Sequence, residues 1–141
     1  MFEVKSHRDM GVSMIAGIGS DIIDVARFND HIKIRDEKFF HRLFTEAEVL
    51  YCSSKREAAQ CFAARFAAKE AFFKALGTGL IAPFSWHDVE IAHNIKKKPF
   101  FLFSKKMESY LRENNLSTVH LSISHTRLFA LAMVVIEKSE P

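Results

Sequence analysis

The segment from Lys55 to Leu76 is the sequence feature that most constrains the fold. Its 22 residues contain no glycine or proline and many alanines, and it stops at Gly77-Thr78-Gly79. That composition strongly favours an α-helix ended by glycine, about 33 Å long. Because Phe62, Phe66 and Phe73 fall on one stripe of this helix, we expect that stripe to lie in the core.

Capping motifs predict where other helices begin. Thr45-Glu46-Ala47-Glu48 and Ser54-Lys55-Arg56-Glu57 both fit the capping box. The first predicts a short helix, and the second predicts the start of the long one. Asp24 is well placed to cap a helix that ends near Ile34.

Apolar and alternating runs predict five strands: Ile15–Ile23, Asp88–His93, Pro99–Phe103, Thr118–Ser124 and Phe129–Glu137. We expect the first strand to end in a turn at Ser20-Asp21, and Ser104 to cap a helix over 105–115. This order of elements predicts an α+β domain in which an antiparallel sheet packs around the long central helix.

Length and composition are those of one globular domain. The 141 residues are 48% hydrophobic and 26% charged. We expect a single domain over 14–141 and a loose extension over 1–13, with Met1 and Met14 as alternative starts. The longest apolar run, Leu128–Ile136, is far shorter than the roughly 20 residues that span a bilayer. The extension also lacks the apolar segment of a secretory signal, so we expect no membrane partner.

The charge and the cysteines add two expectations. The net charge of +3 favours an anionic partner without identifying it. Cys52 and Cys61 are the only cysteines, and their spacing matches no metal or redox motif. A disulfide between them is conceivable, but we expect two reduced, half-buried thiols and therefore a cytoplasmic protein.

A second stripe of the long helix carries chemistry. Ala63, Ala67, Glu70 and Lys74 follow one another at helical spacing, which predicts an open notch flanked by a carboxylate and an ammonium group. The alternative is an exposed ion pair between Glu70 and Lys74, worth about 0.3–0.5 kcal/mol.

Asp21 is a second candidate carboxylate. It follows Gly17-Ile18-Gly19, where it could simply cap a turn. Two carboxylates from separate elements suit a hard cation such as Mg²⁺, although the spacing does not show that Asp21 meets Glu70. An acid after the glycines argues against phosphate binding by this segment and for a metal.

His125 ends an alternating strand beside Thr126 and Arg127. A lone histidine in such a turn is more often solvated than catalytic. The other histidines show no zinc-binding spacing, and the chain lacks the nucleophile-elbow, Walker and dinucleotide-binding motifs.

Taken together, several segments resemble the holo-acyl-carrier-protein synthases, the small bacterial-type members of the phosphopantetheinyl transferase superfamily. The matching segments are GIGSDIID (17–24), FFHRLFTEAE (39–48), FAARFAAKEAFFKALGTG (62–79), WHDVEI (86–91) and LSISHT (121–126). The resemblance runs in order over nearly the whole chain. It departs at Lys96-Lys97-Lys98-Pro99, where the family often has Gly-Lys-Pro.

The resemblance implies an activity and an assembly. The 4'-phosphopantetheine group of coenzyme A would be transferred to a serine of apo-acyl-carrier protein, releasing adenosine 3',5'-bisphosphate and supporting fatty acid biosynthesis. It also implies the phosphopantetheinyl transferase fold and a homotrimer with each active site at a subunit junction.

The resemblance also assigns roles to residues. Asp21 and Glu70 would be the Mg²⁺ ligands and, with Lys74, the catalytic residues. Three candidates for the general base stay open: a Mg²⁺-bound water, Asp21 and Lys74. The coenzyme A contacts would come from Arg65, Lys74, His125 and Thr126.

Docking of the acidic carrier protein is expected at Arg27, Arg35 and Arg42, which lie in and after the first expected helix and, we expect, away from the long helix that carries Glu70. The alternative is that these arginines are merely solvated.

Two rival functions remain. A nucleic-acid-binding module would need clustered basic residues with exposed aromatics, whereas these phenylalanines are placed for burial, so we expect no nucleic acid. A non-catalytic subunit would be expected to lack some of Asp21, Glu70, Lys74 and His125, which are all present.

Overall fold

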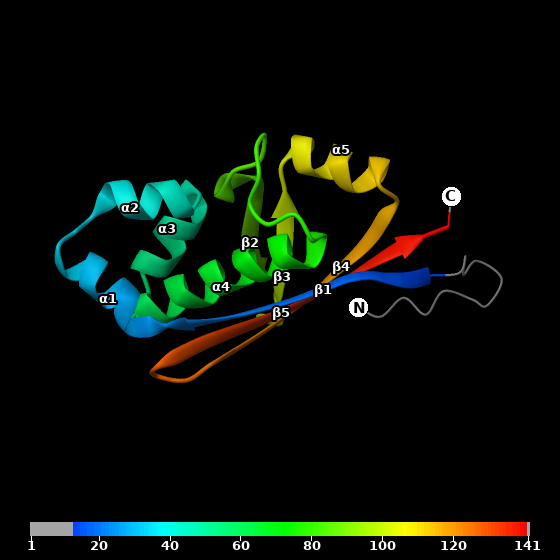
Figure 1. Ribbon diagram of the computed structural model, residues 1–141. Helices are drawn as coiled ribbons and strands as arrows, with labels where there is room; N and C mark the ends of the chain where they lie inside the picture. The colour runs from blue at the N-terminus through cyan, green and yellow to red at the C-terminus, as the bar shows by residue number, and fades with distance from the viewer. Residues whose placement is uncertain (1–12, 141) are drawn as a thin grey trace.

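The computed structural model describes residues 13–140. Figure 1 shows α1 to α3 gathered at one end of the long helix α4, and α5 near the other. The elements in chain order are β1 (Ser13–Asp24), α1 (Val25–Lys33), α2 (Glu37–Leu43), α3 (Glu46–Ser53), α4 (Ala58–Leu76), the 3-10 turn η1 (Trp86–Asp88), β2 (Val89–His93), β3 (Pro99–Phe103), α5 (Lys105–Glu113), β4 (Leu116–His125) and β5 (Phe129–Ser139).

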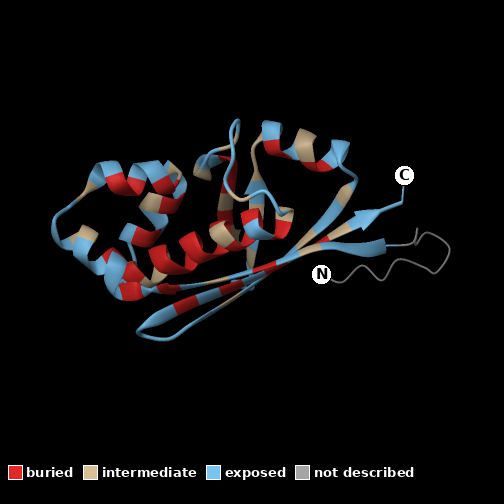
Figure 2. Cartoon of the chain, viewed as in Figure 1, coloured by how far each residue is buried: buried red, intermediate tan, exposed pale blue. Residues whose placement is uncertain are grey.

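The strands form two antiparallel sheets. One has three strands in the order β1-β5-β4, and the other is the pair β2-β3. The central helix α4 packs along the three-stranded sheet over β1 and β5, and most of its residues are buried, as Figure 2 shows. The predicted α+β class and the antiparallel packing on a long helix are confirmed, with two sheets where one was expected. The expected N-terminal extension lies outside the described residues except for Ser13, which already pairs with Ser139 in β1.

The long helix is shorter than predicted at its start. α4 begins at Ala58, and its N-cap residue Glu57 makes no side-chain capping bond. The predicted capping box at Ser54 is wrong because Ser54 ends α3, where its hydroxyl donates to the carbonyl of Tyr51 at 2.7 Å. The predicted end is confirmed, since Gly77 adopts the left-handed conformation with φ of 81°.

Two glycines bring β1 unusually close to α4. A Cβ atom on Gly19 would lie 2.0 Å from the carbonyl oxygen of Ala71, and one on Gly17 would lie 1.9 Å from that of Ala75. The glycines therefore mark close helix–strand packing, and β1 continues to Asp24. The turn predicted at Ser20-Asp21 is therefore wrong, because β1 runs through both residues while it packs on α4.

The predicted open notch is also absent. Ala63 and Ala67 are completely buried, because the face of α4 that carries them packs into the core. The small side chains serve close packing, and only Glu70 and Lys74 of the predicted stripe reach solvent.

The helix α2 was not predicted. Its N-cap is Asp36, whose carboxylate accepts a hydrogen bond from the backbone N–H of Phe39 at 3.2 Å. Phe39 and Phe40 then join a cluster of aromatic rings around Phe44 and Phe62. The capping box predicted at Thr45 is confirmed at the start of α3, and Ser104 caps α5 as expected.

A buried ion pair crosses the core. Lys69 Nζ lies 2.6 Å from Glu48 Oε1, and both side chains are fully buried. Glu48 also accepts hydrogen bonds from the N–H groups of Thr45 and Ile91, while Lys69 donates to two backbone carbonyls. Every charge is therefore compensated, and α3, α4 and β2 are tied together by this pair.

Cys52 and Cys61 form a disulfide, so the expectation of two reduced thiols is wrong for this structure. The chain reverses between α3 and α4, which brings the two Cα atoms within 5.4 Å. The spacing of the cysteines could not reveal this reversal because it depends on how α3 packs on α4.

The outer face of the three-stranded sheet is apolar and exposed. Ile18 and Ile22 of β1 lie beside Leu131 and Met133 of β5 on the face opposite α4, and each is at least 43% exposed. Figure 2 shows exposed residues alternating with buried ones along β5. Within residues 13–140, no helix combines the length and apolar character needed to cross a bilayer.

Candidate active site

Asp21 and Lys74 meet although they are far apart in the sequence. Lys74 Nζ donates to Asp21 Oδ1 at 2.8 Å and to the backbone carbonyl of Ser20 at 3.1 Å. Asp21 lies on the inner face of β1, opposite the buried Ala132. Lys74 therefore pairs across two elements, and the exposed ion pair considered between it and Glu70 is not formed.

Glu70 lies near this pair and is half-buried. Burial raises the pKa of its carboxyl group, and the negative charge of Asp21 raises it further, whereas Lys74 and Arg27 lower it. The structure thus brings together the two carboxylates whose meeting the sequence spacing could not establish.

Lys74 is held in its charged form. The hydrogen bond that it donates to Asp21 is the main reason that its pKa is raised above the ordinary value, and the charges of Asp21 and Glu70 add to this effect. A lysine with a raised pKa is a poor base at neutral pH and a good partner for an anion.

The two carboxylates have the donor chemistry of a magnesium site. Asp21 and Glu70 offer hard oxygen atoms, and Mg²⁺ commonly takes one or two carboxylates while keeping several waters. Among the described residues, no group of three or more His, Cys, Asp and Glu side chains could hold a metal. A softer or more demanding metal is therefore not matched by this pair.

A second region, which we call the cationic pocket, lies beside the other end of α4. It has a volume of about 460 Å³. Its lining contains Arg65 and His125, both predicted coenzyme A contacts. The other residues of the lining were not predicted as site residues: Tyr51, Lys55, Arg56, Glu57, Gln60, Cys61, Ala64, His93, Lys97, Pro99 and Ile123.

Arg65 forms a buried wall of the cationic pocket. Its guanidinium lies 4.3 Å from the centre of the Tyr51 ring, and Nη1 donates to Cys61 Sγ at 3.2 Å. Nη2 lies 3.3 Å from His93 Nδ1, whereas the buried Nε has no hydrogen-bond partner within the described part of the chain. Burial lowers the pKa of Arg65 despite the nearby charge of Glu48.

His93 lines the same pocket and lies beside Arg65. Burial lowers its pKa, and the positive charges of Arg65 and Lys55 lower it further. The adjacent pair Lys55-Arg56 and the run of lysines at 96–98 are the sequence signals that could have identified this pocket, but neither predicts that three separate segments converge.

The acidic pair and the cationic pocket are separate within one chain. Five residues apart on α4, Arg65 and Glu70 project in directions about 140° apart. His125 lines the pocket on the β4 side, whereas Asp21 lies on β1. The hydroxyl of Thr126 accepts from the N–H groups of two following residues and so closes the β4–β5 turn.

The three candidate docking arginines are exposed. Arg27 was expected to lie away from the helix that carries Glu70, and this is wrong. Its guanidinium lies 5.5 Å from the ring of Phe66 on α4, and its charge lowers the pKa of Glu70. Arg42 lies farther along the chain, against the ring of Phe39 at 5.9 Å.

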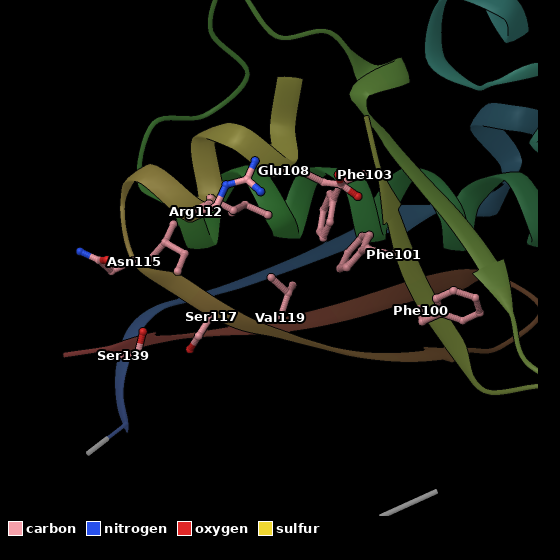
Figure 3. Close-up of a pocket in the computed structure, with 11 residues that line it drawn as sticks. Phe100, Phe101, Phe103, Glu108, Arg112, Asn115, Ser117, Val119 and Ser139 are labelled. Carbon is pink, nitrogen blue, oxygen red and sulfur yellow. The ribbon is translucent and has the colours of Figure 1, made fainter. Parts of the chain in front are cut away.

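A third groove, of about 520 Å³, lies between β3, α5 and β4. Figure 3 shows the rings of Phe101 and Phe103 directed into it, with Glu108 and Arg112 on the helix above. It contains none of the predicted site residues, and its open, aromatic lining offers no constellation for catalysis.

Comparisons with known proteins agree on one family. A sequence profile described as the 4'-phosphopantetheinyl transferase superfamily matches residues 17–133. The holo-[acyl-carrier-protein] synthase of Geobacter sp. (strain M21) is 44% identical over 125 residues, which cover 89% of this chain and 100% of the relative.

Solved structures give the same result. The crystal structure of holo-[acyl-carrier-protein] synthase from Neisseria meningitidis superposes with a TM-score of 0.82 at 38% identity, covering 89% of this chain and 100% of that one. A Bacillus anthracis holo-(acyl-carrier-protein) synthase in complex with CoA (3',5'-ADP) superposes with a TM-score of 0.74 at 38% identity, covering 89% and 99%. This chain belongs to the holo-[acyl-carrier-protein] synthase family of the 4'-phosphopantetheinyl transferase superfamily.

Proposed function

We propose that this chain transfers the 4'-phosphopantetheine group of coenzyme A to a serine of apo-acyl-carrier protein. The products are holo-acyl-carrier protein, used in fatty acid biosynthesis, and adenosine 3',5'-bisphosphate. The observation that carries the proposal is the meeting of Asp21, Glu70 and Lys74 in a chain of this family, one of whose solved members is a complex with CoA (3',5'-ADP).

Asp21 and Glu70 are the proposed ligands of Mg²⁺. Each contributes a carboxylate, and burial together with the negative charge of Asp21 raises the pKa of Glu70, so a bound cation would relieve the repulsion between the two carboxylates. When bound, the ion supplies positive charge to the pyrophosphate of coenzyme A during phosphoryl transfer.

Lys74 is the proposed phosphate-binding cation. Its raised pKa keeps it charged, which favours charge neutralisation over the role of general base. Its side chain is 50% exposed, so it can move from Asp21 toward an incoming phosphate. Asp21 remains a candidate to accept the serine proton.

Arg65 and His125 are the proposed contacts of the anionic nucleotide. The buried Nε of Arg65, which has no hydrogen-bond partner in the described part of the chain, and the surrounding basic side chains make the cationic pocket suited to phosphate groups. Thr126, which closes the adjacent turn, is proposed to present His125 and to contact the same ligand.

The separation of the two regions supports a homotrimer with shared active sites. Because the acidic pair and the cationic pocket face different directions within one chain, a neighbouring subunit could supply the second half of each site. The exposed apolar face formed by Ile18, Ile22, Leu131 and Met133 is a suitable interface, since a patch of this kind is costly in contact with water.

Carrier-protein docking is proposed at Arg27, Arg35 and Arg42. All three are exposed cations and can attract an acidic partner through long-range electrostatics. The disulfide between Cys52 and Cys61 removes reduced thiols as a reason for a cytoplasmic location, so the proposed cytoplasmic location rests on the substrates alone. Neither nucleic acid nor a membrane is proposed as a partner.

Mass spectrometry tests the proposed function directly. Apo-carrier protein is incubated with this chain, coenzyme A and Mg²⁺, and the intact carrier protein is weighed. A gain of one phosphopantetheine supports the transfer. An unchanged mass, with a known synthase active on the same carrier sample, would show that the proposed activity is wrong.

A further inference from the structure

The disulfide between Cys52 and Cys61 can be reached from one side only. Cys52 is completely buried, whereas Cys61 is half-buried and lines the cationic pocket. Exchange begins when an external thiolate attacks one sulfur of a disulfide. The cationic pocket therefore leads an incoming thiol to Cys61 and not to Cys52.

The charges around Cys61 select which thiols arrive. Arg65 Nη1 lies 3.2 Å from Cys61 Sγ, and among residues 13–140 the buried Nε of the same guanidinium has no hydrogen-bond partner. Lys55, Arg56 and Lys97 also line the pocket, against the single acid Glu57. A thiol that carries negative charge is concentrated there, whereas a cationic thiol is repelled.

We propose that Cys61 is a modification site for anionic low-molecular-weight thiols. The thiolate of the incoming molecule bonds to Cys61 Sγ as the bond between Cys61 Sγ and Cys52 Sγ breaks. Cys52 leaves with the electron pair and takes up a proton from water. The product is a mixed disulfide on Cys61 and a free thiol on Cys52, and the reverse reaction restores the original bond.

Thiol exchange at Cys61 does not require phosphopantetheine transfer, although Cys61 lies in the pocket that is proposed to bind coenzyme A. The proposal needs only the burial of Cys52, the exposure of Cys61 and the surrounding cations. It would hold even if the chain had no transferase activity. The consequence of the exchange is that an anionic group becomes covalently attached inside the cationic pocket.

The test compares thiols of different charge. The oxidised protein is treated at low salt with glutathione, neutral 2-mercaptoethanol or cationic cysteamine, and each rate is divided by the rate of that thiol with bis(2-hydroxyethyl) disulfide. We expect the normalised rate of glutathione to exceed that of cysteamine by about tenfold. This preference should shrink in about 0.5 M salt, because the charges are then almost completely screened.

Peptide mapping and variants complete the test. Trypsin separates Cys61 in peptide 57–65 from Cys52 in peptide 43–55, and we expect the adduct on Cys61. The double variant Lys55→Gln, Arg56→Gln should lose most of the preference, whereas Lys105→Gln, an exposed change on α5, should retain it. Adducts mainly on Cys52, equal normalised rates, or two free thiols in the purified protein would each overturn the proposal.

Discussion

Lys74 Nζ of α4 lies 2.8 Å from Asp21 Oδ1 of β1, across 53 positions of sequence. This ion pair forms where the glycines of β1 let the strand approach the helix backbone. The approach places a cation and two carboxylates in one small region, with Glu70 one helical turn before Lys74.

Replacing Lys74 should impair catalysis more than stability. A half-exposed ion pair contributes at most about 1 kcal/mol to the free energy of unfolding. Lys74→Met should therefore remain folded while kcat falls by about a hundredfold, because a charge that opposes the phosphate is lost. Lys74→Arg should recover part of kcat. Steady-state kinetics and thermal melts check this, and unchanged kcat in Lys74→Met would remove Lys74 from the mechanism.

Glu70→Gln should abolish the proposed metal site without disturbing the fold. The amide is nearly the same shape but a much weaker ligand for Mg²⁺, so kcat should fall by at least about a hundredfold. Wild-type protein should also show a rise in Tm with added MgCl₂, and the variant should show little or none. If the wild-type protein kept its activity in excess EDTA, the assignment of Glu70 as a metal ligand would be contradicted.

His93 of the cationic pocket should make stability depend on pH. In the unfolded chain His93 binds a proton near its ordinary pKa of 6.5, whereas burial and neighbouring cations lower the pKa in the folded chain. Below pH 6.5 the unfolded chain thus binds more protons, so this contribution to the free energy of unfolding declines as pH falls. His93→Gln should lose less stability than wild type between pH 7 and pH 5.5, as urea denaturation at each pH can measure.

The close approach of β1 to α4 can be tested with one methyl group. In Gly19→Ala the new Cβ would lie 2.0 Å from the carbonyl oxygen of Ala71, so strand and helix must separate, at a cost of about 1–3 kcal/mol or more. Activity should also fall, because Asp21 moves with the strand.

Gly77→Ala is the matched control for this change. It introduces strain at a positive φ, but its Cβ meets no atom within 4 Å, so it should cost about 1 kcal/mol and leave activity largely intact. Equal loss of activity in the two variants would show that the close approach does not position Asp21.

A shared active site should allow two inactive variants to complement each other. Asp21→Asn damages the acidic pair and His125→Ala damages the cationic pocket, so a site built from two subunits can regain both intact halves in a mixed trimer. Mixing after mild denaturation should restore about a quarter of wild-type activity or less. Sedimentation of a fully active monomer would refute both the trimer and the sharing.

Carrier-protein docking should respond to charge reversal on Arg42. Arg42→Glu should raise KM for apo-carrier protein about three- to tenfold and weaken its salt dependence, while KM for coenzyme A stays unchanged. Arg27→Glu should affect both, since Arg27 also acts on Glu70. Unchanged carrier kinetics in Arg42→Glu would move the docking surface elsewhere.

Local signals in the sequence were sufficient for much of the fold. The end of α4 at Gly77, the capping box at Thr45 and the cap at Ser104 each depend on residues close in sequence. The start of α4 was misjudged because Ser54 fits a capping box equally well whether it begins one helix or ends another. The helix α2 was missed because its phenylalanines are stabilised by packing against distant rings.

The site was predicted through the resemblance more than through spacing. Nothing local indicates that Asp21 meets Lys74, because the contact depends on how β1 lies on α4. The cationic pocket combines α4 with the end of α3 and with strands from the second half of the chain, so its members Tyr51 and His93 carried no signal of their own. The disulfide was missed for the same reason.

The buried pair of Glu48 and Lys69 limits how this sequence can vary. Removing either partner alone would leave an isolated charge in the core, at a cost of about 3–5 kcal/mol, a large share of the roughly 5–15 kcal/mol that keeps a typical domain folded. Exchanging both for apolar residues at once avoids that cost. Mutational scans that change only one of these two positions at a time will therefore find nearly every substitution destabilising. Libraries that change both positions together can contain apolar pairs that retain the fold.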